Sequence, residues 1–435
     1  MFAALRTVPA DSHGIDTDGI DTDDGERGGR AMDGGSRYLA ERCARWEARK
    51  AGWGGPIFHG RARPGPDDLV LFSNDYLALG GHPRVIAAQT DSLARQGNGL
   101  MMSGVYAGER DPAHELEERL AAFLGAPATM LCQSGWSANV GLIGAIAAPE
   151  EPVYIDALAH GSLWAGIEAA QATPRPFPHH DIEYLELLIR RHGPGLIAVD
   201  TLYSVTGDLC PLAEFVEVAE QTGCRLIADE SHALGVLGPH GAGLAAALGL
   251  SERVDFRTAS LAKAFAGRAG LIACPRPIAR YLPFHAHGAV FSSTLLPHDV
   301  AGLAAVLDLV IGADDRRHRL AANAEAVRDG LTVLGYAVAP STSQIIPLQP
   351  GSEREIARFQ GLLDTRGVFG AAFIPPAVAR DRCVHRLSVH SELDAHDVTR
   401  ILDACATVRE ESGMPDWKST RRLRAARPEE VTASC

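Results

Sequence analysis

Short apolar runs alternate with segments of helical periodicity through the middle of the chain. The runs are residues 128–133 (ATMLCQ), 152–156 (PVYID), 195–200 (GLIAVD), 225–229 (RLIAD) and 254–259 (VDFRTA). The first three lead into segments whose apolar positions recur at helical spacing. This alternation predicts an α/β fold with a mostly parallel sheet flanked by helices. Ligands of such sheets bind beyond the carboxyl ends of the strands.

The pattern changes near Leu295, where long helical segments lead to a second, smaller domain. Its predicted strands are residues 343–350 (SQIIPLQP) and 385–391 (HRLSVHS), and helical spacing marks residues 353–367 and 394–411. We therefore predict five parts: a disordered acidic tail over residues 1–36, an N-terminal helix and leading segment over 37–75, a large domain over 76–300, a small C-terminal α+β domain over 301–412, and a mobile tail over 413–435.

Composition narrows the class of protein. The apolar fraction of 46% and charged fraction of 22% are those of an ordinary soluble protein. A net charge of -13 argues against a nucleic-acid partner. No apolar run approaches the roughly 20 residues needed to span a membrane, and no secretory signal is visible. The eight cysteines show neither a CxxC pair nor metal-ligand spacing, so we expect no metal and a reducing cytoplasm.

One lysine lies among small apolar residues in the stretch FRTASLAKAFAGRAG, residues 256–270. Lys263 follows Ser260, and its Ala, Phe and Gly neighbours partly desolvate the amine, lower its pKa and let it condense with an aldehyde. Upstream, RLIADESHALG ends a strand in Asp229 and brings His232 three residues later. Lys263 alone would indicate a solvated lysine on a helix. A lysine for the aldehyde and a buried carboxylate for the pyridine nitrogen together indicate pyridoxal phosphate (PLP).

Two predicted helix starts offer further contacts to such a cofactor. The turn Ser134-Gly135-Trp136 leaves backbone N–H groups at the positive end of a helix, which is a phosphate site. An ordinary N-cap explains Ser134 as well. His160 opens the next helix and would either stack on a pyridine ring or cap that helix.

Polar residues at other strand ends complete the candidate site. Ser204 and His232 would hydrogen-bond a phenolic oxygen of the cofactor. Asn74 and Tyr76 lie where the chain leaves an early strand in LVLFSNDYLALGGHP. Glu230 should face away from Asp229 if the strand continues, because successive side chains alternate.

In this order along the chain, these motifs strongly resemble the α-oxoamine synthases, a branch of the fold-type-I PLP-dependent transferases. The resemblance runs from about Phe72 to Thr407 and includes SNDYLALGGHP, SGWSAN, DALAHGSLWAG, LYSVTGDLCPLAE, DESHALGVLGPHGAG and FSSTLLP. It implies that Lys263 is the Schiff-base lysine and that Arg386 grips the substrate carboxylate. Asn74 and Tyr76 are further candidate substrate residues. It also implies PLP contacts by Asp229, His232, Ser134, Gly135, Trp136, His160, Ser204, Ser260 and, from the neighbouring subunit of a homodimer with shared active sites, Thr294.

Two departures from the family pattern bear on the substrate. Ala262 stands where most members have glycine or serine, and residues 204–207 read SVTG in place of SMDG. With SLAKAFAGRAG and GVFGAAF, the chain is most like quorum-sensing autoinducer synthases. These join a small amino acid, or S-adenosylmethionine, to a medium-chain acyl-CoA and release CO2, giving an α-amino ketone.

Other interpretations stay open. One is a synthase that uses glycine or alanine, of the 8-amino-7-oxononanoate or 2-amino-3-ketobutyrate type. Another is a different PLP enzyme on the same fold, such as an aminotransferase or a lyase, because the fold does not fix the reaction. A third is a non-catalytic PLP-binding domain. The presence of both Lys263 and Asp229 argues against the third.

Overall fold

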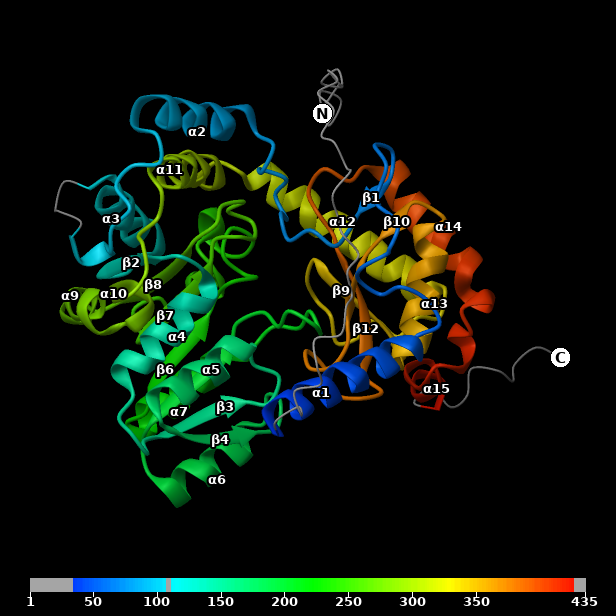
Figure 1. Ribbon diagram of the computed structural model, residues 1–435, viewed down its shortest axis with the longest axis horizontal. Helices are drawn as coiled ribbons and strands as arrows, with labels where there is room; N and C mark the ends of the chain where they lie inside the picture. Colours follow the sequence, from blue (N-terminus) through cyan, green and yellow to red (C-terminus); the bar gives the residue numbers. More distant parts are fainter. Residues whose placement is uncertain (1–33, 107–110, 426–435) are drawn as a thin grey trace, which may run out of the picture.

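A computed structural model describes residues 34–106 and 111–425, which form the two lobes seen in Figure 1. The larger lobe is built on a seven-stranded sheet in the order β2-β8-β7-β6-β5-β3-β4. Only β8 runs antiparallel to its neighbours, so the predicted mostly parallel sheet is confirmed. The strands are β2 (Ala128–Cys132), β3 (Pro152–Asp156), β4 (Thr173–Phe177), β5 (Leu196–Asp200), β6 (Arg225–Asp229), β7 (Phe256–Ser260) and β8 (Gly270–Cys274).

Helices bury apolar side chains against both faces of this sheet. One face packs on α4 (Gly135–Ile146), α5 (Gly161–Ala170) and α9 (Arg276–His285). The other packs on α3 (Pro112–Leu124), α6 (Ile182–His192), α7 (Leu212–Thr222) and α11 (Pro297–Ile311). Successive side chains of β5 point to opposite faces of the sheet, so Leu196 packs on the first group of helices and Ile197 on the second. Burying such a side chain contributes about 1.5–3 kcal/mol.

Shorter helices surround this core and lead out of it. They are α2 (Pro83–Gln96), α8 (Leu244–Ala247), α10 (His287–Val290) and the 3-10 turns η1 (Gly104–Tyr106) and η2 (Pro239–Gly241). α11 packs on α2 and α3, and α12 (Asp314–Val333) then carries the chain to the smaller lobe (Figure 1).

The smaller lobe is a three-stranded antiparallel sheet packed on helices. Its sheet order is β11-β12-β9, with β9 at Ile345–Gly351, β11 at Ala371–Phe373 and β12 at Cys383–Ser388. Its helices α13 (Glu353–Asp364) and α14 (Ala395–Glu411) each begin with a capping box. In each box a side chain at the cap and one three residues on satisfy the free N–H groups of the first turn.

The N-terminal segment belongs to this smaller lobe. α1 (Gly34–Ala51) leads to β1 (Leu69–Val70), which pairs with β10 (Val368–Phe369). Trp53 is buried against the same lobe and donates its indole N–H to Glu353 at 2.9 Å. Helix α1 begins inside the predicted tail of residues 1–36, and residues 1–33 lie outside the described part of the chain.

Residues 413–425 of the predicted mobile tail contain a 3-10 turn and a helix. After η3 (Met414–Asp416), Trp417 is 2% exposed and its ring lies 5.0 Å from that of Phe359. Helix α15 (Lys418–Ala425) follows. The basic residues suggested a solvated end, whereas Met414, Trp417 and Thr420 of this segment are buried. Residues 426–435 lie outside the described part.

Two strands of the large sheet escaped the sequence pattern. β4 carries Pro174 and Pro176, which cannot donate to a neighbouring strand, and it lies at the sheet edge, paired only with β3. β8 follows the lysine stretch directly and reverses direction. Within the described residues, no helix combines the length and the apolarity needed to cross a lipid bilayer.

Candidate active site

Asp229, the last residue of β6, is 4% exposed, and its carboxylate is held by two donors. The Asn139 amide donates to Oδ2 at 2.7 Å, and the Ser231 backbone N–H donates to Oδ1 at 2.9 Å. Thr258 donates its hydroxyl to Asn139 Oδ1 at 2.6 Å, which turns the amide nitrogen toward Asp229. The sequence analysis missed Asn139. Its signal is a polar residue inside the otherwise apolar helix α4.

The same amide connects Asp229 to His160. Asn139 Nδ2 also donates to Ser162 Oγ at 2.8 Å, and Ser162 Oγ lies 2.7 Å from His160 Nδ1. The Ser162 backbone N–H reaches that nitrogen too, so His160 caps α5. Because the Ser162 backbone N–H donates to Nδ1, that nitrogen is an acceptor, and the ring carries a proton on Nε2. The predicted helix cap is therefore observed, and stacking of His160 on a pyridine ring stays a prediction.

The two segments predicted to hold a phosphate meet in the structure. Ser134 caps α4 by accepting from the Ser137 N–H at 3.1 Å, so the N-cap interpretation holds for its side chain. A Cβ on Gly135 would lie 2.6 Å from Ser260 Cβ, and one on Gly270 would lie 2.0 Å from the Ser134 carbonyl oxygen. Only glycine permits this approach of the α4 N-terminus to the ends of β7 and β8. The free N–H groups of that helix and Ser260 thus lie side by side.

Trp136 takes a different place from the rest of its turn. The side chain is 52% exposed, and its ring meets that of His160 edge to face at 6.2 Å. The indole therefore borders the crevice on its outer side.

Lys263 lies in the turn between β7 and β8, not on a helix. Its neighbours Ala264 and Phe265 are buried, and burial lowers the pKa of Lys263 while Asp229 partly opposes the shift. The prediction of a desolvated lysine near Asp229 is confirmed in direction. A lowered pKa increases the fraction of free amine at neutral pH.

A chain of hydrogen bonds joins His232 to the smaller lobe. His232 is 7% exposed, and its Nδ1 lies 2.6 Å from the hydroxyl of the fully buried Tyr76. That hydroxyl is 3.2 Å from Asn74 Oδ1, which also accepts from Arg386 Nη2 at 2.7 Å. Burial, with the charges of Lys263 and Arg386, lowers the pKa of His232 well below its usual range, so His232 is neutral.

Arg386 lies on β12 of the smaller lobe and contacts Ser204 of the larger lobe. It is 4% exposed, and Nη1 donates to the Ser204 carbonyl oxygen at 2.7 Å. The guanidinium lies 4.7 Å from the ring centre of Phe373, a cation–π contact that holds it flat. Its Nε has no partner among the described residues. Ser204 contacts Arg386 through its backbone, a role that the sequence did not predict.

Two further residues lie at the margin of the site. Glu230 faces away from Asp229, as alternation predicts, and its buried carboxylate accepts from the N–H groups of Leu244 and Ala245 at the start of α8. Thr294 runs beside Met102, to whose carbonyl oxygen it donates its N–H at 2.9 Å. The role of Thr294 toward a neighbouring subunit stays a prediction.

These groups fit the demands of PLP. Asp229 is a buried carboxylate whose orientation is fixed, as a protonated pyridine nitrogen requires. Lys263 is a desolvated amine, and the charge of the Asp229 carboxylate influences its pKa. The α4 N-terminus, closed against Ser260 by Gly135, is a cradle for a phosphate.

Comparison with known proteins agrees with this geometry. Residues 66–404 match the family model for aminotransferase class I and II. The chain is 42% identical over 343 residues to the CAI-1 autoinducer synthase of Vibrio campbellii, covering 79% of this chain and 87% of that one. It is 37% identical over 340 residues to the 8-amino-7-oxononanoate synthase of Anaeromyxobacter dehalogenans, covering 78% and 85%.

A solved structure gives the same result for the fold. Serine palmitoyltransferase from S. paucimobilis, with a bound PLP adduct of myriocin, superposes with a TM-score of 0.81 at 25% identity, covering 86% of this chain and 99% of that one. With a family model that matches most of the chain, and with relatives that align over most of their own length, the chain belongs to the α-oxoamine synthases, a PLP-dependent branch of the class I and II aminotransferase family.

Proposed function

We propose that this enzyme condenses an amino acid, or S-adenosylmethionine, with a medium-chain acyl-CoA, releasing CO2 and free CoA and leaving an α-amino ketone. The observation that carries the proposal is the meeting of Asp229, Lys263 and Arg386 at the junction of the two lobes. The 42% identity to an autoinducer synthase supports the choice of substrates.

The large lobe supplies the groups for proton transfer at the amino acid. When bound, PLP supplies an electron sink for the carbanion that forms at the amino acid Cα. Asp229, oriented by Asn139, keeps a proton on the pyridine nitrogen. Lys263 would take the Cα proton as the general base, and the lowering of its pKa by burial favours the neutral amine that this role requires.

Other side chains of the site would hold the cofactor. His232, whose Nδ1 is engaged by Tyr76, and Ser204 would contact its phenolic oxygen. His160, held by Ser162, would stack on its pyridine ring. The N–H groups at the α4 N-terminus and Ser260 would hold its phosphate.

Arg386 grips the amino acid carboxylate. A guanidinium fork matches a carboxylate with two parallel hydrogen bonds, and the unpartnered Nε–H of Arg386 is a donor that a bound carboxylate satisfies. Asn74 and the Ser204 carbonyl hold the rest of the guanidinium. Holding both substrates in this orientation supplies much of the rate.

We further propose a homodimer with shared sites that works in the cytoplasm. The resemblance of FSSTLLP to the family segment that reaches a neighbour's phosphate supports a contribution by Thr294. Seven described cysteines are free thiols, which suits a reducing compartment. Mixing inactive Lys263→Ala with a Ser293 and Thr294 double variant should restore activity through hybrid dimers. No recovery despite demonstrated subunit exchange would count against shared sites.

The reaction itself is tested with a carboxyl-labelled amino acid and a series of acyl-CoAs, with products identified by mass spectrometry. We expect one labelled CO2 and one free CoA for each ketone. An amino group transferred to a keto acid, with the label retained, would establish the aminotransferase alternative instead. Activity with glycine or alanine alone would assign the enzyme to the other synthase type.

A further inference from the structure

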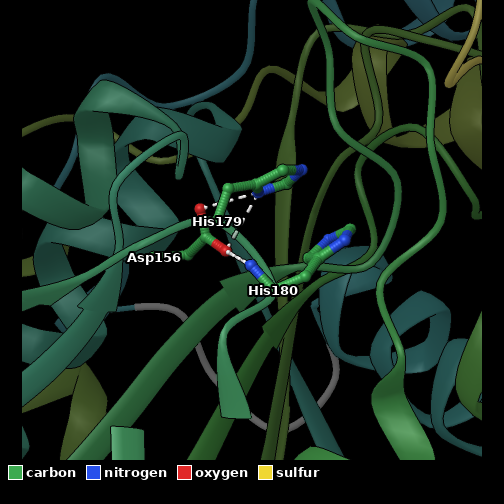
Figure 2. Close-up of side chains that lie close together, drawn as sticks. All are labelled: Asp156, His179 and His180. Atoms are coloured by element: carbon green, nitrogen blue, oxygen red, sulfur yellow. Dashed lines mark hydrogen bonds and ion pairs between the residues drawn. The ribbon is translucent and has the colours of Figure 1, made fainter. Parts of the chain in front are cut away.

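A buried charge cluster lies beside the candidate site, and the reaction proposed above does not use it. Figure 2 shows Asp156 at the end of β3, with His179 and His180 in the turn between β4 and α6. His179 Nδ1 lies 3.0 and 3.1 Å from the two carboxylate oxygens of Asp156. Asp156 is completely buried and also accepts from the backbone N–H of His180 at 3.1 Å.

The opposite edge of the His179 ring meets a second carboxylate. Nε2 lies 2.7 Å from Asp208 Oδ2. A carboxylate only accepts hydrogen bonds, so a ring that contacts one at each nitrogen donates twice and is an imidazolium. Burial alone would lower the pKa of His179, but Asp156 and Asp208 outweigh it and raise the pKa to about 9.

Asp208 connects this ring to the residues that face the substrate. It closes a turn in which the Tyr203 N–H donates to the Asp208 carbonyl oxygen at 3.1 Å and the Gly207 N–H donates to the Tyr203 carbonyl oxygen at 3.0 Å. Ser204 lies inside that turn, and its carbonyl oxygen holds Arg386 Nη1 at 2.7 Å. The Tyr203 ring packs edge to face on His179 at 4.4 Å.

We propose that His179 is a positioning residue for the acyl transfer: its ring ties the Tyr203–Asp208 turn to the end of β3 and thereby fixes Ser204 and Arg386 for the amino acid. The proposal rests on the function proposed above, because Arg386 is taken to bind the substrate carboxylate. The smaller lobe contacts the same turn at a different point, because Ser343 Oγ donates to the Gly207 carbonyl oxygen at 2.7 Å.

A metal ion is the rival occupant of this cluster. One ligand atom from each of Asp156, His179 and His180 lies within 4.8 Å of the others. Two features favour a protonated His179 ring over a bound metal ion. Both His179 nitrogens already face carboxylates, and the His180 ring lies against His179, tilted by 30° with centroids 3.7 Å apart. The imidazolium supplies between the two carboxylates the positive charge that a cation would bring.

The test compares His179→Gln with the matched control His180→Asn. Glutamine keeps one donor but neither the charge nor the second contact. His180 has a φ of 60°, which asparagine tolerates, and its bond to Asp156 comes from the backbone. Its ring contacts Asp208 Oδ2 only at 3.5 Å, whereas the His179 ring contacts the same oxygen at 2.7 Å. Amino acid affinity is measured by the spectral change of bound PLP, without acyl-CoA, alongside PLP affinity and the KM and kcat for CO2 release.

We expect His179→Gln to weaken amino acid binding roughly tenfold, the loss of one charge-assisted bond, while PLP affinity stays within about threefold of wild type. His180→Asn should match wild type. Unchanged amino acid affinity in His179→Gln would overturn the proposal. So would equal damage in His180→Asn together with stimulation of the wild type by Zn²⁺, which would establish the metal site.

Two further measurements keep the outcome decisive. If His179→Gln does not retain PLP or its far-ultraviolet circular dichroism, Asp208→Asn is used instead. That variant still accepts the bond but removes one charge, and unchanged amino acid affinity in it also overturns the proposal. If the wild type releases no CO2 with any acyl-CoA, the proposed function fails, yet the amino acid titrations still test His179.

Discussion

Arg386 should set the affinity of the enzyme for its amino acid, and Arg386→Lys tests this with the charge preserved. In the structure the guanidinium donates to the Ser204 carbonyl oxygen and to Asn74 Oδ1, both at 2.7 Å, and stacks on Phe373. A lysine ammonium is a single point with no fork, so it cannot keep both protein contacts and also grip a carboxylate with two parallel bonds.

The expected loss follows from the contacts that lysine cannot make. One charge-assisted hydrogen bond is worth about 1.5–3 kcal/mol, which corresponds to roughly a tenfold to hundredfold weaker dissociation constant. Arg386→Lys also loses the stacking on Phe373, which is worth about 0.5–2 kcal/mol. The lysine side chain is then less well ordered, which weakens its binding of the carboxylate further. We therefore expect the upper part of that range for the amino acid and little change for acyl-CoA, whose thioester arrives from elsewhere.

The assay titrates the PLP absorption band with amino acid and then measures KM for acyl-CoA at saturating amino acid. Arg316→Lys is the matched control, since Arg316 also donates to a backbone oxygen, that of Leu77 at 2.8 Å, but makes no contact with the candidate site. Equal amino acid affinity in wild type and Arg386→Lys would refute the carboxylate role. An equal loss for both substrates would show general damage to the junction.

Three other changes should have measurable effects. Borohydride should fix PLP on the peptide of Lys263, one of only three lysines in the chain, and Lys263→Ala should lose both that label and the absorption band; labelling of another lysine would refute the assignment. Asn139→Ala should destabilise the apoprotein by about 1.5–3 kcal/mol in urea because buried Asp229 loses a donor, more than Asn323→Ala, whose partners are neutral carbonyls; equal losses would contradict this. The His179 pKa is raised to about 9, so its stabilisation is full below about pH 6.5, the unfolded value, and is lost as pH rises through 9. The melting temperature of wild type should therefore fall between pH 6.5 and 9.5 more steeply than that of His179→Gln, and parallel curves would refute the ion bridge.

The parts of the site that the sequence predicted are those with a strict position along the chain. Asp229 ends a buried strand, and Lys263 follows another between small residues, so both lie at the same edge of a parallel sheet. Strand ends and helix starts can be read from apolar runs and from capping residues. For the same reason His160 and Ser134 were found, although periodicity could not separate a cap from a ligand.

What the sequence could not predict are contacts between distant segments. Asn139 and Thr258 are 119 positions apart, and nothing local marks one as the acceptor for the other. The same holds for Arg386 and the Ser204 carbonyl, because a backbone oxygen carries no residue signature. The sequence pattern missed β4 for another reason. Its prolines are typical of loops, and a strand tolerates them only at the edge of a sheet.

The missed residues share a physical role, which bears on how the site works. Asn139 and His179 each donate to a buried carboxylate, Asp229 in one case and Asp156 and Asp208 in the other. A buried carboxylate without a hydrogen-bond donor is costly, so these donors stabilise the carboxylates in their buried positions. Holding these groups before the substrates arrive means that no reorganisation is needed when charge develops at the amino acid Cα. The residues proposed to react could therefore be predicted from their own chemistry, whereas the residues that hold them in place could be recognised only from the fold.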